Sequence, residues 1–314
     1  YGLSQNLTGK QFFYGFQVGA TYRLTDNFSV FGGARGVLAN CAYEGAISNI
    51  TANGVAAGSY LSGVKAMVDA GLAQLEPVKD VAGYKEQYQQ LAAQSAALAQ
   101  GAALLGSDFN LDCAQSGFGI TPMIGLDWNL GKLNLAAKYE FRTKINLEND
   151  SENTSANVTA LMPAYADGAK VRSDIPAILT LGAQYQFTDA VRVMGGFHYY
   201  WDKDAKGTPI KKGDNTWEAN LGIEWDVNDK ILLSLGGQRT QYGFDDTDMA
   251  DTNFNISSSA ICLGGAYKFS EKMKLNVGYM HSFYDDHKFT NANGTACNYT
   301  RKNDVVGVSL DIAF

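Results

Sequence analysis

Hydrophobic and polar residues alternate along most of the chain, in stretches longer than an ordinary soluble strand. In 12–24 the apolar residues occupy one face, and small or polar residues occupy the other. The apolar set of that stretch is Phe12, Tyr14, Phe16, Val18, Ala20, Tyr22 and Leu24. The stretches 117–130 and 133–147 repeat the pattern. Because successive side chains of a strand point to opposite faces, each stretch predicts a strand with one apolar face.

The same alternation recurs to the end of the chain and predicts eleven strands in all. The remaining stretches are 27–40, 171–187, 190–203, 213–227, 230–243, 253–269, 272–286 and 303–314. The last of them places Val306, Val308, Leu310, Ile312 and Phe314 on one face. This pattern resembles the C-terminal strand that directs outer-membrane barrels to assembly. The alternative is an ordinary edge strand that ends in Phe.

The connections between these strands alternate in length. Short turns are expected at 25–27, 131–132, 188–190, 228–230 and 270–272, and long polar loops at 42–112, 148–170, 204–212, 244–252 and 287–302. Short periplasmic turns and long extracellular loops are typical of outer-membrane barrels, whereas a soluble sandwich has no reason for strict alternation. The four tryptophans lie near strand ends, where a membrane–water boundary favours them. The predicted fold class is therefore all-β, an antiparallel transmembrane β-barrel.

Composition agrees with this prediction. The chain has 34 Gly, 17 Tyr and 16 Phe but only 5 Pro, which suits many closely packed strands. No apolar run approaches the roughly 18–20 residues of a transmembrane helix. The net charge of −7, without a basic cluster, argues against a nucleic-acid partner. The sequence begins at Tyr1 without a signal peptide. A protein with this pattern must be exported, so we expect a mature or truncated chain.

Residues 42–112 form an insert of a different kind, rich in Ala and Gln with helical spacing. One apolar stripe contains Leu61, Val64, Val68, Leu72 and Leu75, and a second contains Val81, Tyr84, Tyr88, Leu91 and Leu98. The break at Glu76-Pro77 separates them, so the spacing predicts helices over 59–75 and about 80–104. Two interpretations remain: a helical hairpin whose stripes pack on each other, which spacing alone favours, and a lipid-binding lid.

Cys41 and Cys113 bracket the insert at the tops of consecutive predicted strands. Exported proteins meet oxidising conditions, so we expect a Cys41–Cys113 disulfide at the base of the insert, with two buried free thiols as the alternative. For Cys262 and Cys297 unpaired thiols are favoured, because Cys262 lies in a strand and Cys297 in a loop.

Candidate chemistry is sparse. The three histidines lack metal-ligand spacing, and His198 with Asp202 is better explained as rim polarity than as a catalytic pair. The run "DDTDMAD" (245–251) lacks the Gly and terminal Glu of an EF-hand loop, which favours a solvated acidic loop over a Ca²⁺ site. We therefore expect no enzyme activity, no cofactor and no metal. Inward-facing charges predict a polar lumen with ion pairs; they are Lys138, Glu140, Arg142, Lys144, Arg172, Asp174, Arg192, Glu218 and Glu224.

One long run resembles a known family. "VRSDIPAILTLGAQYQFTDAVRVMGGFHYYWDKD" (171–204) is similar to a strand pair of FadL-type outer-membrane transporters for long-chain fatty acids and aromatic hydrocarbons. The shared features are an Asp/Pro strand start, an "LGAQY"-like strand, a short turn and an aromatic strand that ends in Trp. "FSVFGGARGVLA" (28–39) followed by a helical insert resembles the strand before the family's third extracellular loop.

The resemblance implies a fourteen-stranded barrel, of which this chain holds the fourth to fourteenth strands, without the family's N-terminal hatch and kinked third strand. Residues 1–314 would be a single, N-terminally truncated barrel domain, with 42–112 as its extracellular helical insert. The capture loops would be 42–112 and 148–170. Ligand-binding candidates are then Leu61, Val64, Met67, Val68, Leu72, Leu75, Leu161 and Met162.

The implied function is passive transport of hydrophobic small molecules, most of all long-chain fatty acids, in the bacterial outer membrane. Implied partners are a hydrophobic ligand, outer-membrane lipid and lipopolysaccharide, with no nucleic acid and a monomeric state. Two alternatives remain open: a non-specific diffusion porin, and a structural or adhesive outer-membrane barrel.

Overall fold

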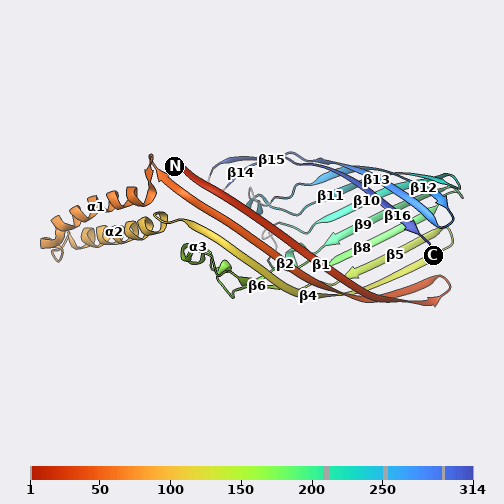
Figure 1. Ribbon diagram of the computed structural model, residues 1–314, viewed down its shortest axis with the longest axis horizontal. Coiled ribbons are helices and arrows are strands. Elements are labelled where there is room, and N and C mark those ends of the chain that lie inside the picture. The colour runs from red at the N-terminus through yellow and green to blue at the C-terminus, as the bar shows by residue number, and fades with distance from the viewer. Residues whose placement is uncertain (1, 208–212, 250–253, 292–293, 314) are drawn as a thin grey trace. The chain divides into compact units, whose positions relative to one another are not determined.

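A computed structural model describes residues 2–207, 213–249, 254–291 and 294–313. Its main sheet has eleven long strands in the order β1-β2-β4-β5-β8-β9-β10-β11-β12-β13-β16 (Figure 1). Their bounds are β1 Gly2–Thr25, β2 Phe28–Ala52, β4 Phe109–Leu130, β5 Leu133–Glu140, β8 Ile178–Gln186, β9 Val191–Tyr200, β10 Trp217–Asn228, β11 Ile231–Gln241, β12 Ser258–Ser270, β13 Met273–Tyr284 and β16 Lys302–Ile312. Neighbours follow chain order, and the pairings from β4 to β16 are antiparallel. The eleven predicted strands are confirmed.

Shorter elements fill the connections. The strands are β3 Val55–Ala56, β6 Asn146–Asp150 and β7 Lys170–Arg172, together with the hairpin of β14 His287–Thr290 and β15 Ala296–Tyr299. The helices are α1 Ala57–Leu75, α2 Lys85–Leu105 and α3 Ala156–Leu161, with 3-10 turns η1 Glu76–Val78, η2 Pro163–Tyr165, η3 Asp202–Asp204 and η4 Asp246–Asp248. The helical insert is therefore present. No helix in the described part of the chain is long and apolar enough to cross a membrane.

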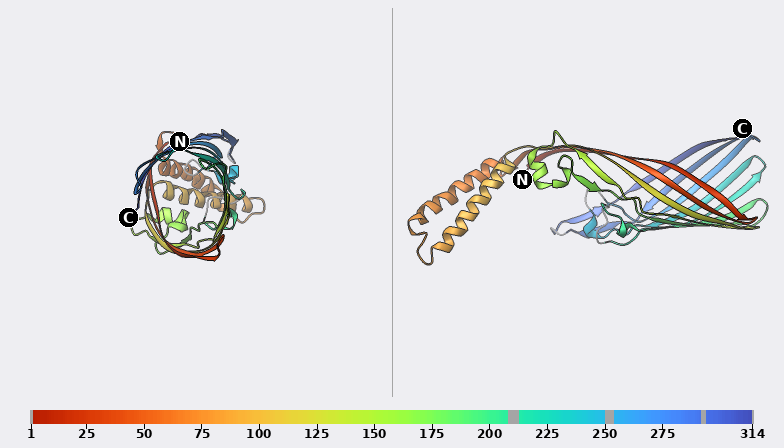
Figure 2. Two further views of the ribbon diagram at one scale, coloured as in Figure 1. Left: turned by 90° about the vertical axis from the view of Figure 1, so that its right-hand side faces the viewer. Right: turned by 90° about the horizontal axis from the view of Figure 1, so that it is seen from below.

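The chain divides into two compact units. The first unit contains 1–13, 39–117 and 147–171, and the second contains 14–38, 118–146 and 172–314. In the second unit the strands curve around a common interior (Figure 2, left). In the first unit α1 and α2 lie side by side (Figure 2, right). The prediction of one barrel domain with an insert at 42–112 stays a prediction.

The apolar face of the strands is exposed, as a lipid-facing surface requires. Phe16, Val18, Leu221, Val306 and Val308 have exposed fractions of 66–77%. On β9, β10 and β11 the opposite face points to the interior, and its side chains are mostly half-buried, whereas β1 is exposed along its whole length. This is the reverse of a soluble protein, where the large apolar side chains lie inside.

Three strands are longer than predicted, and one of them is β4, which begins at Phe109 rather than at residue 117. Residues 1–9 and 42–52 fall outside the predicted strands, but β1 begins at Gly2 and β2 continues to Ala52. A membrane crossing needs about 9–11 residues, so strands of 24 and 25 residues extend well beyond one bilayer. Parts of six predicted features lie outside the described residues: 208–212 of the loop 204–212, 250–252 of the loop 244–252, 250–251 of the acidic run 245–251, residue 253 of the strand 253–269, 292–293 of the loop 287–302, and the terminal Phe314.

A break in two strands marks the most deeply buried part of the second unit. The ladder of β5 ends at Glu140, and β8 begins only at Ile178; between them Thr143 and Ile175 form an isolated bridge. Thr143 and Ile145 are 0% exposed. A Cβ at Gly119 would lie 2.6 Å from Thr143 Cγ2, so only glycine fits against this cluster.

Candidate functional site

The helical hairpin of α1 and α2 is packed through small residues. A Cβ at Gly58 would lie 2.6 Å from Gly106 Cα, so the helix ends meet closely at the base of the hairpin. A Cβ at Gly101 would lie 3.2 Å from Leu61 Cδ1, which shows that Leu61 covers Gly101. The missing side chains let the two backbones approach, which explains the Ala- and Gly-rich composition of this segment.

Two carboxylates fasten the hairpin. Asp69 Oδ2 lies 2.5 Å from Lys65 Nζ, and Asp69 Oδ1 accepts a 2.5 Å hydrogen bond from Ser95 Oγ of α2. Glu76 Oε1 lies 2.6 Å from Lys79 Nζ, and its Oε2 accepts a 2.5 Å hydrogen bond from the Tyr88 hydroxyl. Each carboxylate therefore joins α2 to α1 or to the turn that follows α1.

These contacts make the hairpin sensitive to acid. Lys65 and then Ser95 hold the pKa of Asp69 below its ordinary 3.8, and Lys79 and then Tyr88 hold the pKa of Glu76 below its ordinary 4.5. A carboxylate with a depressed pKa stabilises the fold above its ordinary pKa, and this contribution is lost as the pH falls through the depressed value. We expect amides of α1 and α2 to exchange faster at about pH 3 than at about pH 6, once corrected for intrinsic rates, measured by hydrogen exchange.

The control for this prediction is Asp69→Asn combined with Glu76→Gln. This variant should lose the acid-dependent component while it keeps two hydrogen-bonding side chains. An equal increase of exchange at low pH in the variant would contradict the assignment.

Of the predicted ligand-binding residues of α1, the structure shows Leu61 against α2. Leu61, Val64, Val68, Leu72 and Leu75 are half-buried. Val68 is followed by Asp69, which bonds to α2, and Leu61 covers Gly101. Leu61 therefore takes part in the packing between the two helices, and the role of the other stripe residues stays a prediction. Met67 lies off this stripe and is 76% exposed.

The other two predicted ligand-binding residues lie on or beside α3. Leu161 is 56% exposed and Met162 is 44% exposed. Asn157 Nδ2 donates to Ser107 Oγ, just beyond α2, and Asn110 N donates to Ser155 Oγ at 3.2 Å. These bonds anchor α3 beside the base of the hairpin. Whether these residues bind a ligand stays a prediction.

The expected disulfide is absent, because Cys41 and Cys113 are both buried free thiols. Each thiol has a local partner: Cys41 interacts with the Tyr43 hydroxyl, and Cys113 Sγ donates to the Ala114 carbonyl at 3.7 Å. The prediction rested on the two cysteines lying at the tops of neighbouring strands. A disulfide also requires that the two Cβ atoms point toward each other, which neighbouring strands do not guarantee. Cys262 and Cys297 are free as well, in agreement with the favoured interpretation.

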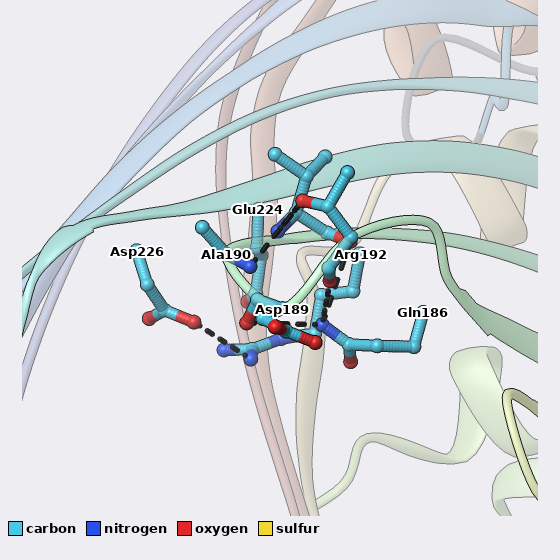
Figure 3. A network of polar contacts seen from close by, with 8 residues as sticks. Gln186, Asp189, Ala190, Arg192, Glu224 and Asp226 are labelled. Atoms are coloured by element: carbon cyan, nitrogen blue, oxygen red, sulfur yellow. Dashed lines mark hydrogen bonds and ion pairs between the residues drawn. The ribbon is translucent and has the colours of Figure 1, made fainter.

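Ion pairs line the interior of the second unit, as the inward charges predicted. Glu140 pairs with Arg35 and lies 2.7 Å from Lys138 Nζ. At the short-turn end, Arg192 Nε lies 2.5 Å from Glu224 Oε2, and Arg192 Nη1 lies 3.2 Å from Asp226 Oδ2 (Figure 3). Gln186 closes the adjacent turn by donating to the Thr188 carbonyl at 2.7 Å. These pairs satisfy charge within the interior.

Near the long-loop end a second polar group surrounds Glu218. Its Oε2 accepts from the Tyr200 hydroxyl at 2.7 Å and lies 3.2 Å from His198 Nδ1, and its Oε1 accepts from Thr240 Oγ1 at 2.9 Å. His198 thus pairs with Glu218, whereas Asp202 accepts from the Thr216 backbone. Among the described residues no group of three or more His, Cys, Asp or Glu side chains is placed to hold a metal ion.

Between these two polar zones the inner wall is apolar and hollowed. A cavity of about 660 Å³ lies against β9 to β16. One interior row, in register across the six strands, is Met194, Gly222, Gly236, Cys262, Met280 and Val305. The next row toward the short turns contains Gly264, Gly278 and Gly307. The glycines remove side chains from the wall, and the row beside them supplies soft apolar groups.

Polar residues border this hollow on both sides. The row toward the long loops contains Asn220, Gln238, Ser282 and Asn303, and the row toward the short turns contains Asp226, Asn276 and Ser309. The hollow is therefore a mostly apolar patch, with Glu224, Ser234, Asn276 and Ser309 at its short-turn side, within a more polar interior.

Sequence reasoning missed this patch. Met194, Cys262 and Met280 occupy the inward phase of strands whose outward phase is also apolar, so alternation is weakest there. This weak alternation was the one feature of the sequence that could have indicated the patch. Methionine suits such a wall because its flexible thioether adapts to ligands of different shape.

Comparison with solved structures identifies the architecture. A Pseudomonas aeruginosa FadL homologue is 13% identical to this chain, with a TM-score of 0.58. The match covers 96% of this chain and 66% of the homologue. The Ralstonia pickettii toluene transporter TbuX is 13% identical over 97% of this chain and 68% of its own, with a TM-score of 0.52. The TodX monoaromatic hydrocarbon channel deltaS2 mutant is 15% identical, with a TM-score of 0.56. The match covers 98% of this chain and 71% of the TodX chain.

The chain has the FadL-type barrel fold. It is an outer-membrane β-barrel by this fold and by its exposed apolar face, and it spans about two-thirds of the FadL homologue's length. No family model matches the sequence. No curated protein matches it either. The solved proteins that share the FadL-type fold are named as transporters or channels rather than enzymes.

Proposed function

We propose that this protein admits hydrophobic small molecules, long-chain fatty acids above all, through the outer membrane by passive diffusion. The observation that supports this most is the apolar hollow of about 660 Å³ between two polar zones of the interior. A hydrophobic guest gains about 0.8 kcal/mol for each buried methylene, so even a short contact with this wall retains an acyl chain. Two solved proteins of the same fold are named as a toluene transporter and a monoaromatic hydrocarbon channel.

The proposal extends to capture outside the membrane. Residues 42–112 and 148–170 would take up the ligand, with the exposed Met67, Leu161 and Met162 as its first contacts. The half-buried stripe of α1 would support them from within the hairpin. The protein would act as a monomer within outer-membrane lipid and lipopolysaccharide, without a cofactor or nucleic acid.

A capture role predicts that charge at α3 weakens ligand binding. Leu161→Asp combined with Met162→Asp should lower the affinity for a labelled long-chain fatty acid about tenfold, because each carboxylate must be desolvated beside an acyl chain. Equilibrium binding in detergent, with the full chain, measures this affinity. Both positions are exposed, so assembly should stay normal, which heat-modifiable gel mobility checks.

The matched control is Val81→Asp, at another exposed apolar position of the first unit, which is 50% exposed. It should leave the affinity unchanged. Unchanged affinity in the folded double variant would remove α3 from the capture mechanism.

A diffusion porin is the second candidate, and the charged interior favours it. The pairs of Arg192 with Glu224 and of Lys138 with Glu140 are what a water-filled lining requires. Liposomes that contain the protein should distinguish the two. Swelling driven by sugars with no saturable fatty-acid binding would replace the transporter proposal by the porin.

A further inference from the structure

An aromatic side chain stands on the inward face of β2. Phe31 lies four positions before Arg35, which pairs with Glu140 in the interior. Because side chains two or four positions apart on a strand share one face, the Phe31 side chain also points inward. An aromatic ring of a barrel is more often expected at the lipid boundary. Neither lipid contact nor the ion pairs of the interior explain why Phe31 is there.

Glycines of two strands fix the position of the Phe31 ring. A Cβ at Gly19 of β1 would lie 2.5 Å from Phe31 Cε2, and a Cβ at Gly33 of β2 would lie 2.8 Å from Phe31 Cζ. Either Cβ would displace the ring, so the missing side chains provide its seat. At Gly125 of β4 a Cβ would lie 3.5 Å from Phe31 Cβ. The ring therefore lies against β1 and β2, with β4 beside its base.

A compact pocket of about 270 Å³ opens beside Phe31. Small residues form its floor: Gly125 of β4 is paired with Lys138 of β5, and Ala136 of β5 is paired with Gly182 of β8. A Cβ at Gly182 would meet nothing within 4 Å, so the floor is open there. The pocket shares no lining residue with the hollow against β9 to β16. It is therefore a separate site of the interior wall.

The charge, size and lining of the pocket match a neutral aromatic guest. Its charged lining residues are Asp127 and Lys138, one of each sign, so neither an anion nor a cation is favoured. An apolar cavity of about 150 Å³ already holds benzene, so this pocket has room for one substituted ring. Phe31 adds an aromatic wall, and aromatic pairs interact more favourably than the burial of their area alone provides.

We propose that the Phe31 pocket is a second binding site of the interior, which takes one small neutral aromatic molecule while the hollow takes an acyl chain. Phe31 is then the residue that discriminates rings from chains. The two guests contact different residues, so each should bind in the presence of the other. This inference rests on the proposed function only in that guests reach the interior, because no residue of the pocket belongs to the hollow or to the capture loops.

Binding of fluorobenzene to the full chain in lipid nanodiscs, measured by fluorine NMR with empty nanodiscs as background, tests the proposal. A long-chain fatty acid is present at saturation, so that it occupies the hollow. The unmodified protein should still bind fluorobenzene saturably. Phe31→Leu should weaken this binding about fivefold, because the aromatic contact is lost. Gly182→Leu should weaken it about tenfold or more, because the new side chain fills the floor of the pocket.

Gly307→Leu is the matched control for Gly182→Leu. It also adds a side chain where a Cβ meets nothing within 4 Å, but in the hollow. It should weaken fatty-acid binding and leave fluorobenzene binding unchanged, whereas Gly182→Leu should do the reverse.

Fluorobenzoate is the matched ligand control. Its carboxylate must be desolvated beside Asp127 and Lys138, whose charges cancel, so it should bind about tenfold or more weakly than fluorobenzene. Equally tight binding of the two ligands would overturn the assignment of a neutral guest.

Two further results would overturn the pocket: displacement of all fluorobenzene by the fatty acid, or equal fluorobenzene binding by the unmodified protein and both pocket variants. Absence of fatty-acid binding, with fluorobenzene still bound at Phe31, would refute the proposed function and support the pocket. If Phe31→Leu fails to fold, as judged by heat-modifiable gel mobility, Gly182→Leu decides the outcome alone.

Discussion

Gly307→Trp is expected to reduce uptake of a hydrophobic substrate about tenfold or more, with the barrel intact. A Cβ at Gly307 meets nothing within 4 Å, and the position lines the interior hollow beside Met280 and Val305. An indole ring would occupy space that a guest must enter, and overpacking typically costs about 1–3 kcal/mol, where 1.4 kcal/mol is tenfold. Saturable uptake of a labelled fatty acid and of toluene into proteoliposomes measures the effect.

The control is Gly182→Trp, an equally unobstructed position on β8 outside the hollow. It narrows the same interior at another point, so it should reduce uptake less. If both variants reduce uptake equally, the whole bore limits passage, and the hollow has no special role.

Asp174→Ala should destabilise the barrel by about 3 kcal/mol, the range for removal of one partner of a buried ion pair. The Asp174 side chain is 0% exposed, and its Oδ1 lies 2.5 Å from Arg172 Nη2. Its carboxylate also accepts backbone N–H bonds from Ile145 at 3.3 Å and Lys206 at 3.1 Å, across the break between β5 and β8. The substitution would leave these donors without their acceptor. Urea unfolding followed by Trp fluorescence in detergent or lipid measures the change.

Glu148→Gln is the matched control for Asp174, because Glu148 also pairs with a cation, Lys170 at 3.2 Å, but is 60% exposed. Exposed pairs contribute about 0–1 kcal/mol, so this variant should unfold almost as the parent does. Comparable losses in both variants would show that burial at the strand break does not matter.

The strands were predictable because contact with lipid on one face makes apolar and polar residues alternate with a period of two. Phe16 and Val18 face outward while Gln17 faces inward, and this contrast is strong wherever one face meets hydrocarbon. Residues 42–52 of β2 lack that contrast, because a strand beyond the membrane has no lipid to face. The sequence therefore predicted the membrane-crossing part of β2 and missed its extension to Ala52.

The candidate site was less predictable for a related reason. The spacing of Leu61, Val64 and Val68 predicted an apolar helix face, but spacing does not say what covers that face. In the structure Leu61 lies against Gly101 of α2, and Asp69 and Ser95 are bonded across the pair. Likewise Met194 and Met280 are separated by 86 positions, and only the registers of four strand pairs bring them into one row.

The close approach of Gly58 and Gly106 has a consequence for how the sheet assembles. β2 must find β4 across the longest connection of the chain, and closing a flexible loop of n residues costs about (3/2)RT ln n. Two antiparallel helices that meet at their base return the chain to its starting point. Once the hairpin has formed, only the few residues on either side of it remain to be closed. The long connection between β2 and β4 then has nearly the closure entropy of a tight turn. Its contacts also stay local in sequence, which favours fast pairing of the two strands.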